Sequence, residues 1–175
     1  TFSGFKEGKK DKIFRTGLKK VYTYKVDLSK NKKVSESQIN LNDKVLLMKF
    51  YKDKKVENGK KTALSKYFVL VNVDESSKSI YTLMEYQHDY TTTSCDENGN
   101  CTTTYHYDRK DLLLVVTSKE TGKVKRLRIP KSQLQKNSYL YGGVYGYADE
   151  SGYNMFYKDI EKNLSLPENA EKVKA

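Results

Sequence analysis

Residues 90–105 form a nearly palindromic segment whose mirror point is Asn98, with the sequence Tyr-Thr-Thr-Thr-Ser-Cys-Asp-Glu-Asn-Gly-Asn-Cys-Thr-Thr-Thr-Tyr. Thr and Tyr favour extended backbone, and Asn98-Gly99 supplies residues that tolerate positive φ in a hairpin turn. In this register Cys95 lies opposite Cys101, at the short separation that a disulfide requires. The segment therefore predicts a two-stranded ribbon that is closed near its tip by a Cys95–Cys101 disulfide.

Strand-like segments fill most of the remaining chain, with turn signals about every 10 residues. The expected strands cover residues 21–28, 44–51, 67–73, 79–86, 111–117, 123–129, 139–147 and 153–158. Short helical turns are expected only at 35–42 and 132–137. No amphipathic stretch of helical length separates the strands, which argues against parallel βαβ units.

The sequence thus predicts an all-β fold, an antiparallel meander of sequential hairpins with minimal helix. The meander would form a barrel, a sandwich or a partial propeller. We expect one β domain over residues 1–166, a projecting hairpin at 87–109, and a frayed or disordered tail at 167–175. The hairpin should project because its threonines offer little apolar surface to bury.

Positive charge is concentrated in the first third of the chain. Residues 1–61 hold 18 basic and 7 acidic side chains, whereas residues 62–175 hold 15 of each. Such a field could attract nucleic acid, acidic polysaccharide, lipopolysaccharide or an anionic membrane surface. Only 4 of the 33 basic residues are Arg, which argues against sequence-specific reading of nucleic acid. The simpler interpretation is solvated surface lysines. The candidate polyanion contacts are Lys9, Lys10, Lys19, Lys20, Lys54 and Lys55.

The predicted disulfide implies an oxidising compartment, such as the periplasm, the cell surface or the medium. The chain begins at Thr1 without a Met, which fits either removal of a signal peptide or trimming of a longer chain. No window approaches the roughly 18 apolar residues that a membrane-spanning helix needs. We therefore expect an extracytoplasmic location and no transmembrane segment.

The ribbon also carries the only two histidines, and they suggest an alternative metal site. The mirror register places His88 opposite Asp108 and Tyr90 opposite His106, all on one face. His88, His106 and Asp108 could then offer nitrogen and oxygen ligands to zinc. A slip of one residue would destroy this arrangement. Surface histidines are the favoured interpretation, so neither a metal nor a cofactor is expected.

Two other interpretations of the ribbon are weaker. Residues 96–100 are rich in Asp, Glu and Asn like a calcium loop, but the bidentate Glu at the end of a 12-residue loop is absent. The cysteine spacing is not Cys-x-x-Cys and no helix follows, which argues against a redox dithiol.

Residues 139–147 place tyrosines at a period of two, so a strand here would carry a tyrosine strip on one face. The strip consists of Tyr139, Tyr141, Tyr145 and Tyr147. A row of such rings could stack on sugars or bases as a ligand or partner contact. Ordinary sheet packing, with the hydroxyls reaching solvent, is the favoured alternative, and the absence of Trp weakens the sugar interpretation.

No catalytic motif emerges from the sequence. It contains no Gly-rich phosphate loop, no Gly-x-Ser-x-Gly and no His-Glu-x-x-His. We assign no catalytic residue, and an enzyme is the least favoured class of function.

Three short motifs lie within residues 111–164: Ile129-Pro-Lys-Ser-Gln133, Gly142-Gly143 and Asp159-Ile-Glu-Lys-Asn163. In these motifs the segment resembles a blade-like repeat of uncharacterised exported β-repeat, propeller-like proteins of Gram-negative bacteria. The chain departs from that pattern because it lacks the usual tryptophan, and because Lys158-Asp159 stands where the pattern has an Asn-Asp pair. It also falls short of a full propeller of four-stranded blades. The resemblance implies export and β architecture, and it implies no reaction.

These patterns favour an exported, non-catalytic β module that binds or scaffolds an envelope protein or a polysaccharide. Its contacts would come from the tyrosine strip or the cysteine ribbon. A polyanion-binding protein acting through the basic first third is the main alternative, and a metal-dependent enzyme is the weakest. Salt separates the first two, because binding through several lysines weakens steeply as salt rises.

Overall fold

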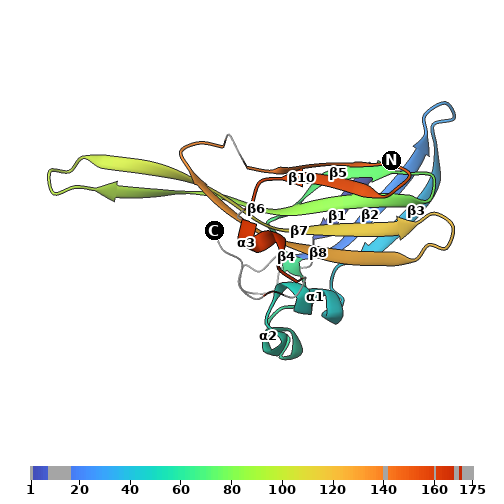
Figure 1. Cartoon of the computed structure of the whole chain (residues 1–175), viewed down its shortest axis with the longest axis horizontal. Coiled ribbons are helices and arrows are strands. Elements are labelled where there is room, and N and C mark those ends of the chain that lie inside the picture. The colour runs from blue at the N-terminus through green and yellow to red at the C-terminus, as the bar shows by residue number, and fades with distance from the viewer. Residues whose placement is uncertain (1, 8–16, 140–141, 160, 168–169, 171–175) are drawn as a thin grey trace.

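The computed structural model describes residues 2–7, 17–139, 142–159, 161–167 and 170 (Figure 1). The predicted all-β fold is confirmed, because the strands pair antiparallel throughout these residues. In chain order the elements are β1 (Phe2–Glu7), β2 (Gly17–Asp27), β3 (Lys32–Asn40), α1 (Lys44–Phe50), α2 (Asp53–Glu57), β4 (Leu64–Ser65), β5 (Phe68–Glu75), β6 (Ser79–Cys95), β7 (Cys101–Ser118), β8 (Val124–Lys136), β9 (Val144–Ala148), β10 (Tyr153–Tyr157) and α3 (Glu161–Leu164).

The strands form three layers, with the sheet β5-β6-β7-β8 in the middle. One face of this central sheet packs against the sheet β1-β2-β3 and against α1, around a core that includes Val21, Leu47 and Leu113. The opposite face is covered by the two-stranded hairpin β9–β10. Within the described residues the sheets do not close into a barrel.

The two central strands are apolar on both faces because both faces are covered. On β7, Leu112 and Leu114 point toward β9–β10, whereas Leu113 and Val115 point toward the other core. A strand buried on both sides is a continuous apolar run rather than an alternating one. This explains the Leu-Leu-Leu-Val-Val segment in an otherwise polar chain.

Lys44–Phe50 form the helix α1, and not the strand that the apolar character of residues 44–51 predicted. The Asp43 side chain accepts a hydrogen bond from the backbone N–H of Leu46 at 3.1 Å and so caps α1 at its N-terminus. Leu46 and Leu47 are buried while Val45 is 71% exposed, which is the one-sided pattern of a surface helix. A turn at residues 58–59 follows α2, with Gly59 at φ 68°.

Both predicted helical turns were also wrong. Residues 35–40 belong to β3, and residues 132–136 continue β8 until Asn137 ends it with φ 56°. Strand β1 was not expected from the sequence. Most of the predicted tail at 167–175 lies outside the described residues.

Candidate functional site

The long hairpin formed by β6 and β7 extends beyond the sheets as a projecting arm (Figure 1). We define the arm as residues 89–105. Its register is the predicted one, because Cys95 pairs with Cys101 and Tyr90 pairs with His106. Residues 89–103 are exposed on both faces of the ribbon. The arm is therefore an ordered element that is not covered by the rest of the described chain.

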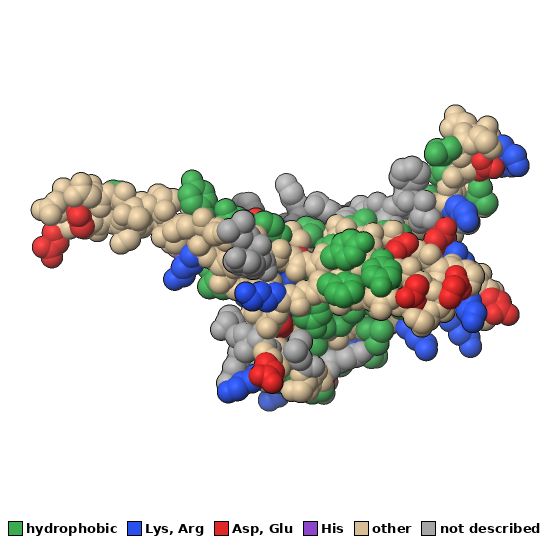
Figure 2. Space-filling view, turned by 45° about the horizontal axis from the view of Figure 1, so that its top comes forward, with side chains coloured by type: hydrophobic (Ala, Val, Ile, Leu, Met, Phe, Trp, Pro, Cys, Tyr) green, Lys and Arg blue, Asp and Glu red, His purple; other side chains and the backbone are tan. Residues whose placement is uncertain are grey.

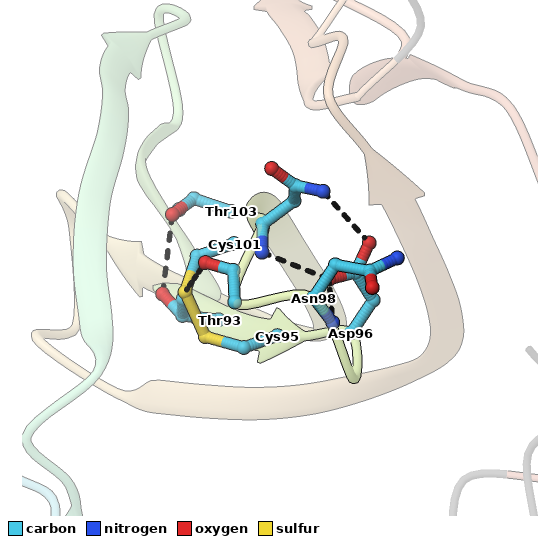
Figure 3. The surroundings of a disulfide bond; sticks show 8 residues. Thr93, Cys95, Asp96, Asn98, Cys101 and Thr103 are labelled. Carbon is cyan, nitrogen blue, oxygen red and sulfur yellow. Dashed lines mark hydrogen bonds between the residues drawn. A yellow bond between two sulfur atoms is a disulfide. The ribbon is translucent and has the colours of Figure 1, made fainter.

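The tip of the arm is fixed by a disulfide and by a carboxylate (Figure 3). Cys95 and Cys101 form the predicted disulfide. Oδ1 of Asp96 accepts hydrogen bonds from the backbone N–H groups of Asn98 at 3.0 Å and Asn100 at 2.8 Å. These bonds, that from Asn100 first, hold the pKa of Asp96 below its ordinary value. Gly99 completes the turn at φ 81°. The Asp96 carboxylate therefore stabilises the turn by accepting hydrogen bonds from its backbone.

The base of the arm is anchored through Arg109. Its guanidinium forms an ion pair with Asp89, with Nη2 donating to Oδ2 at 3.2 Å, and the Arg109 side chain is only 4% exposed. The ring of Tyr139 lies 4.9 Å from the guanidinium carbon and 5.5 Å from the ring of Tyr107. This combination of an ion pair and a cation–π contact ties the loop after β8 to the arm.

His88, His106 and Asp108 share one face of the ribbon as predicted, but each contacts another side chain. The ring of His88 lies 4.1 Å from that of Tyr67. Nε2 of His106 lies 2.8 Å from the Thr92 hydroxyl oxygen. The Asp108 carboxylate forms an ion pair with Lys110 at 2.7 Å. Among the described residues, no three His, Cys, Asp or Glu side chains are grouped so that they could hold a metal ion.

The predicted tyrosine strip is only partly formed. Tyr145 and Tyr147 share the outer face of β9. Tyr139 lies before Gly143, whose φ of 109° is incompatible with a continuous strand, so Tyr139 is not part of β9. Tyr141 lies outside the described residues.

Phe156 on β10 lies beside Tyr145 and Tyr147. It lies 6.4 Å from Tyr145 and 6.1 Å from Tyr147, and the exposed fractions of Phe156, Tyr145 and Tyr147 are 58%, 66% and 39%. We call these three rings the aromatic face. Hydrophobic side chains gather on this side of the molecule in Figure 2. Sequence reasoning missed Phe156, although pairing 153–158 with the tyrosine strand could have found it.

The described lysines among the predicted polyanion contacts lie on two separate elements. Lys19 and Lys20 lie on β2, Lys54 and Lys55 lie on α2, and Lys9 and Lys10 lie outside the described residues. At the β2–β3 turn, acidic neighbours partly neutralise the basic charge. Lys33 pairs with Glu36 at 2.6 Å, and Lys30 pairs with Asp27 at 3.7 Å.

No family model matches the chain, and no match was found among curated proteins or solved structures. In the part of the chain that the structure describes, none of the helices has the length and apolar character needed to cross a bilayer.

Proposed function

We propose that the chain is a non-catalytic binding or scaffolding module that works outside the reducing cytosol and contacts an envelope protein through its arm. The observation that carries this proposal is the exposure of residues 89–103 on both faces of an ordered ribbon. Ordering a chain segment costs about 1–2 kcal/mol per residue, and burial within the arm itself recovers little of this. Burial of the arm against a partner would offset this ordering cost.

The disulfide supports the proposed location. Disulfides persist in the periplasm, at cell surfaces and in the medium, and are rare in the cytosol. Cys95 and Cys101 are exposed at the arm tip, where a reducing environment would reach them directly. The predicted resemblance of residues 111–164 to exported β-repeat proteins would imply the same location.

The backbone of the arm suggests how a partner would bind. In the described residues, β5 pairs with β6 only as far as Tyr86, and β8 pairs with β7 only as far as His106. The N–H of Gln87 still donates to the Tyr67 carbonyl oxygen, and Asn137 binds both backbone groups of Tyr105. Beyond these contacts both edges of the arm present backbone N–H and C=O groups outward. Such edges accept an additional strand, and threonine is compatible with that pairing. We therefore favour strand addition by a partner protein.

Removal of the tip tests the proposal. A variant that lacks residues 94–102 should fold, because its core is remote from the tip, and should lose capture of the envelope partner. The matched control carries Cys95→Ser and Cys101→Ser, which keeps the length and the threonines of the arm. Unchanged capture by the deletion variant would show that the arm is not the contact.

The aromatic face favours polysaccharide as a second candidate partner. The three exposed rings of the aromatic face have centroids 6.1 to 6.4 Å apart, so they can stack on pyranose faces. The tyrosine hydroxyls can hydrogen-bond to sugar hydroxyls. Affinity electrophoresis in gels that contain neutral or acidic polysaccharide tests this candidate. Retardation that is lost in Tyr145→Ala but persists at high salt would indicate stacking. Retardation that high salt abolishes would instead indicate polyanion binding by lysines.

A further inference from the structure

Two oppositely charged side chains are completely buried near the base of the arm. Glu85 lies on β6, four residues before the arm begins, and Lys131 lies on β8. Both side chains have 0% exposure, and Nζ of Lys131 donates to Oε1 of Glu85. Strand β7 lies between their two strands in the sheet. The contact therefore joins strands that are not neighbours.

The hydrogen bonds of this pair do not satisfy an ammonium group. Oε2 of Glu85 accepts from Nε2 of Gln87 at 2.8 Å, so both carboxylate oxygens have donors. An ammonium has three N–H donors, and among the described residues the only acceptor for Nζ of Lys131 is Oε1 of Glu85. A buried charge is costly unless it is fully paired and hydrogen-bonded. An amide nitrogen, with a single N–H, has fewer donors to satisfy.

We infer that Lys131 and Glu85 condense into an intramolecular isopeptide bond. A proton passes from Nζ to Oε1, which leaves a neutral amine beside a carboxylic acid. The lone pair of Nζ then attacks Cδ of Glu85 and forms the C–N bond, while the N–H of Gln87 stabilises the negative charge that develops on Oε2. The C–Oε1 bond breaks, and Oε1 leaves as water with a second proton from the nitrogen. One ammonium and one carboxylate thus give one amide and one water, with no oxidant or other reactant.

The surroundings favour this product. Charged reactants lose their hydration in a buried site, whereas the neutral amide does not need it. The product keeps the bond from Gln87, because Oε2 becomes the amide oxygen. The new bond would link β6 to β8 across β7 at the base of the arm. A load applied to the arm would then be carried by a covalent bond as well as by the sheet.

The mass of the full-length chain tests this inference. After reduction of the disulfide, the purified protein should weigh about 18 Da less than its sequence predicts, which is one water. Trypsin does not cut after an acylated lysine, so the digest should contain residues 79–109 joined to residues 129–136. The exposed pair Lys33–Glu36 serves as an internal comparison and should stay unlinked, because water surrounds it.

A Lys131→Arg variant is the control, because a guanidinium keeps the charge but does not form this amide. Its mass should equal the sequence mass. If this variant also weighed about 18 Da less than its sequence mass, the water would have been lost elsewhere, for example at an aspartate. That result would overturn the inference. A wild-type mass equal to the sequence mass, with separate peptides 79–109 and 129–131, would overturn it as well. Both wild-type measurements remain decisive if the variant does not fold.

Discussion

The ring of Tyr153 lies across Gly146 on the neighbouring strand, so closely that no side chain fits between them. A Cβ atom on Gly146 would lie 2.5 Å from the Tyr153 hydroxyl oxygen and 2.7 Å from its ring. The same ring stacks on Tyr81 of the central sheet at 5.2 Å. Nδ2 of Asn72 donates to both the Tyr153 hydroxyl oxygen and the Gly146 carbonyl oxygen, at 3.2 and 2.7 Å. These contacts fasten the β9–β10 hairpin, and with it the aromatic face, to the central sheet.

A Gly146→Ala substitution should therefore destabilise the protein. Forcing one carbon into a filled site typically costs about 1–3 kcal/mol in the free energy of unfolding. Chemical denaturation measures this loss. In a Tyr153→Leu background the clash is absent, so the same substitution should cost much less. An equal cost in both backgrounds would show that Tyr153 is not the obstacle.

Asp43→Ala should remove the cap of α1. Its carboxylate accepts from the Leu46 N–H, and loss of such a cap costs about 1 kcal/mol in the free energy of unfolding. Lys44→Ala, on the neighbouring exposed residue, is the control and should leave stability nearly unchanged. Equal denaturation midpoints for Asp43→Ala and wild type would contradict the assignment of Asp43 as the N-cap.

Replacing both cysteines with serine should loosen the tip without weakening the core. The bridge closes a short segment, with a sequence separation of 6, and all of that segment is exposed. Amide hydrogen exchange should accelerate within the arm, while the midpoint of global unfolding changes little. A large drop in the global midpoint would mean that the arm is part of the cooperative core.

Acid should open the turn at the arm tip. The pKa of Asp96 is lowered in the folded turn, first by the hydrogen bond from the Asn100 backbone, so the ionised carboxylate stabilises the turn. That stability is present above the ordinary aspartate pKa and is lost as the pH falls through the lowered folded value, below about pH 4. Amide chemical shifts of Asn98 and Asn100 should follow this loss, and Asp96→Asn should abolish its pH dependence. A transition above pH 5 would assign the effect to another group.

The arm could be predicted from the sequence because its mirror pattern pairs each residue with one opposite residue. The Asn98-Gly99 turn fixed the register, and the disulfide followed from it. The helix α1 could not be separated from a strand by its apolar run, since short apolar segments fit either state. Asp43 was the available signal, because an aspartate directly before such a run favours a helix cap.

The other misses depend on contacts between distant segments. Phe156 joins Tyr145 only through the pairing of β9 with β10. Glu85 and Lys131 meet only because β6, β7 and β8 lie in that order, and a charged residue within a strand pattern suggests a solvent-facing position.

Site-specific photo-crosslinking in the native envelope tests whether the arm is the contact element. A photoreactive residue is placed at Thr93 or Thr103, which face each other on the arm, and at Glu120 in the exposed turn between β7 and β8 as the control. We predict a discrete protein adduct from both arm positions and none from Glu120. Adducts of equal yield from Glu120, or no adduct from either threonine, would show that the arm is not the contact element.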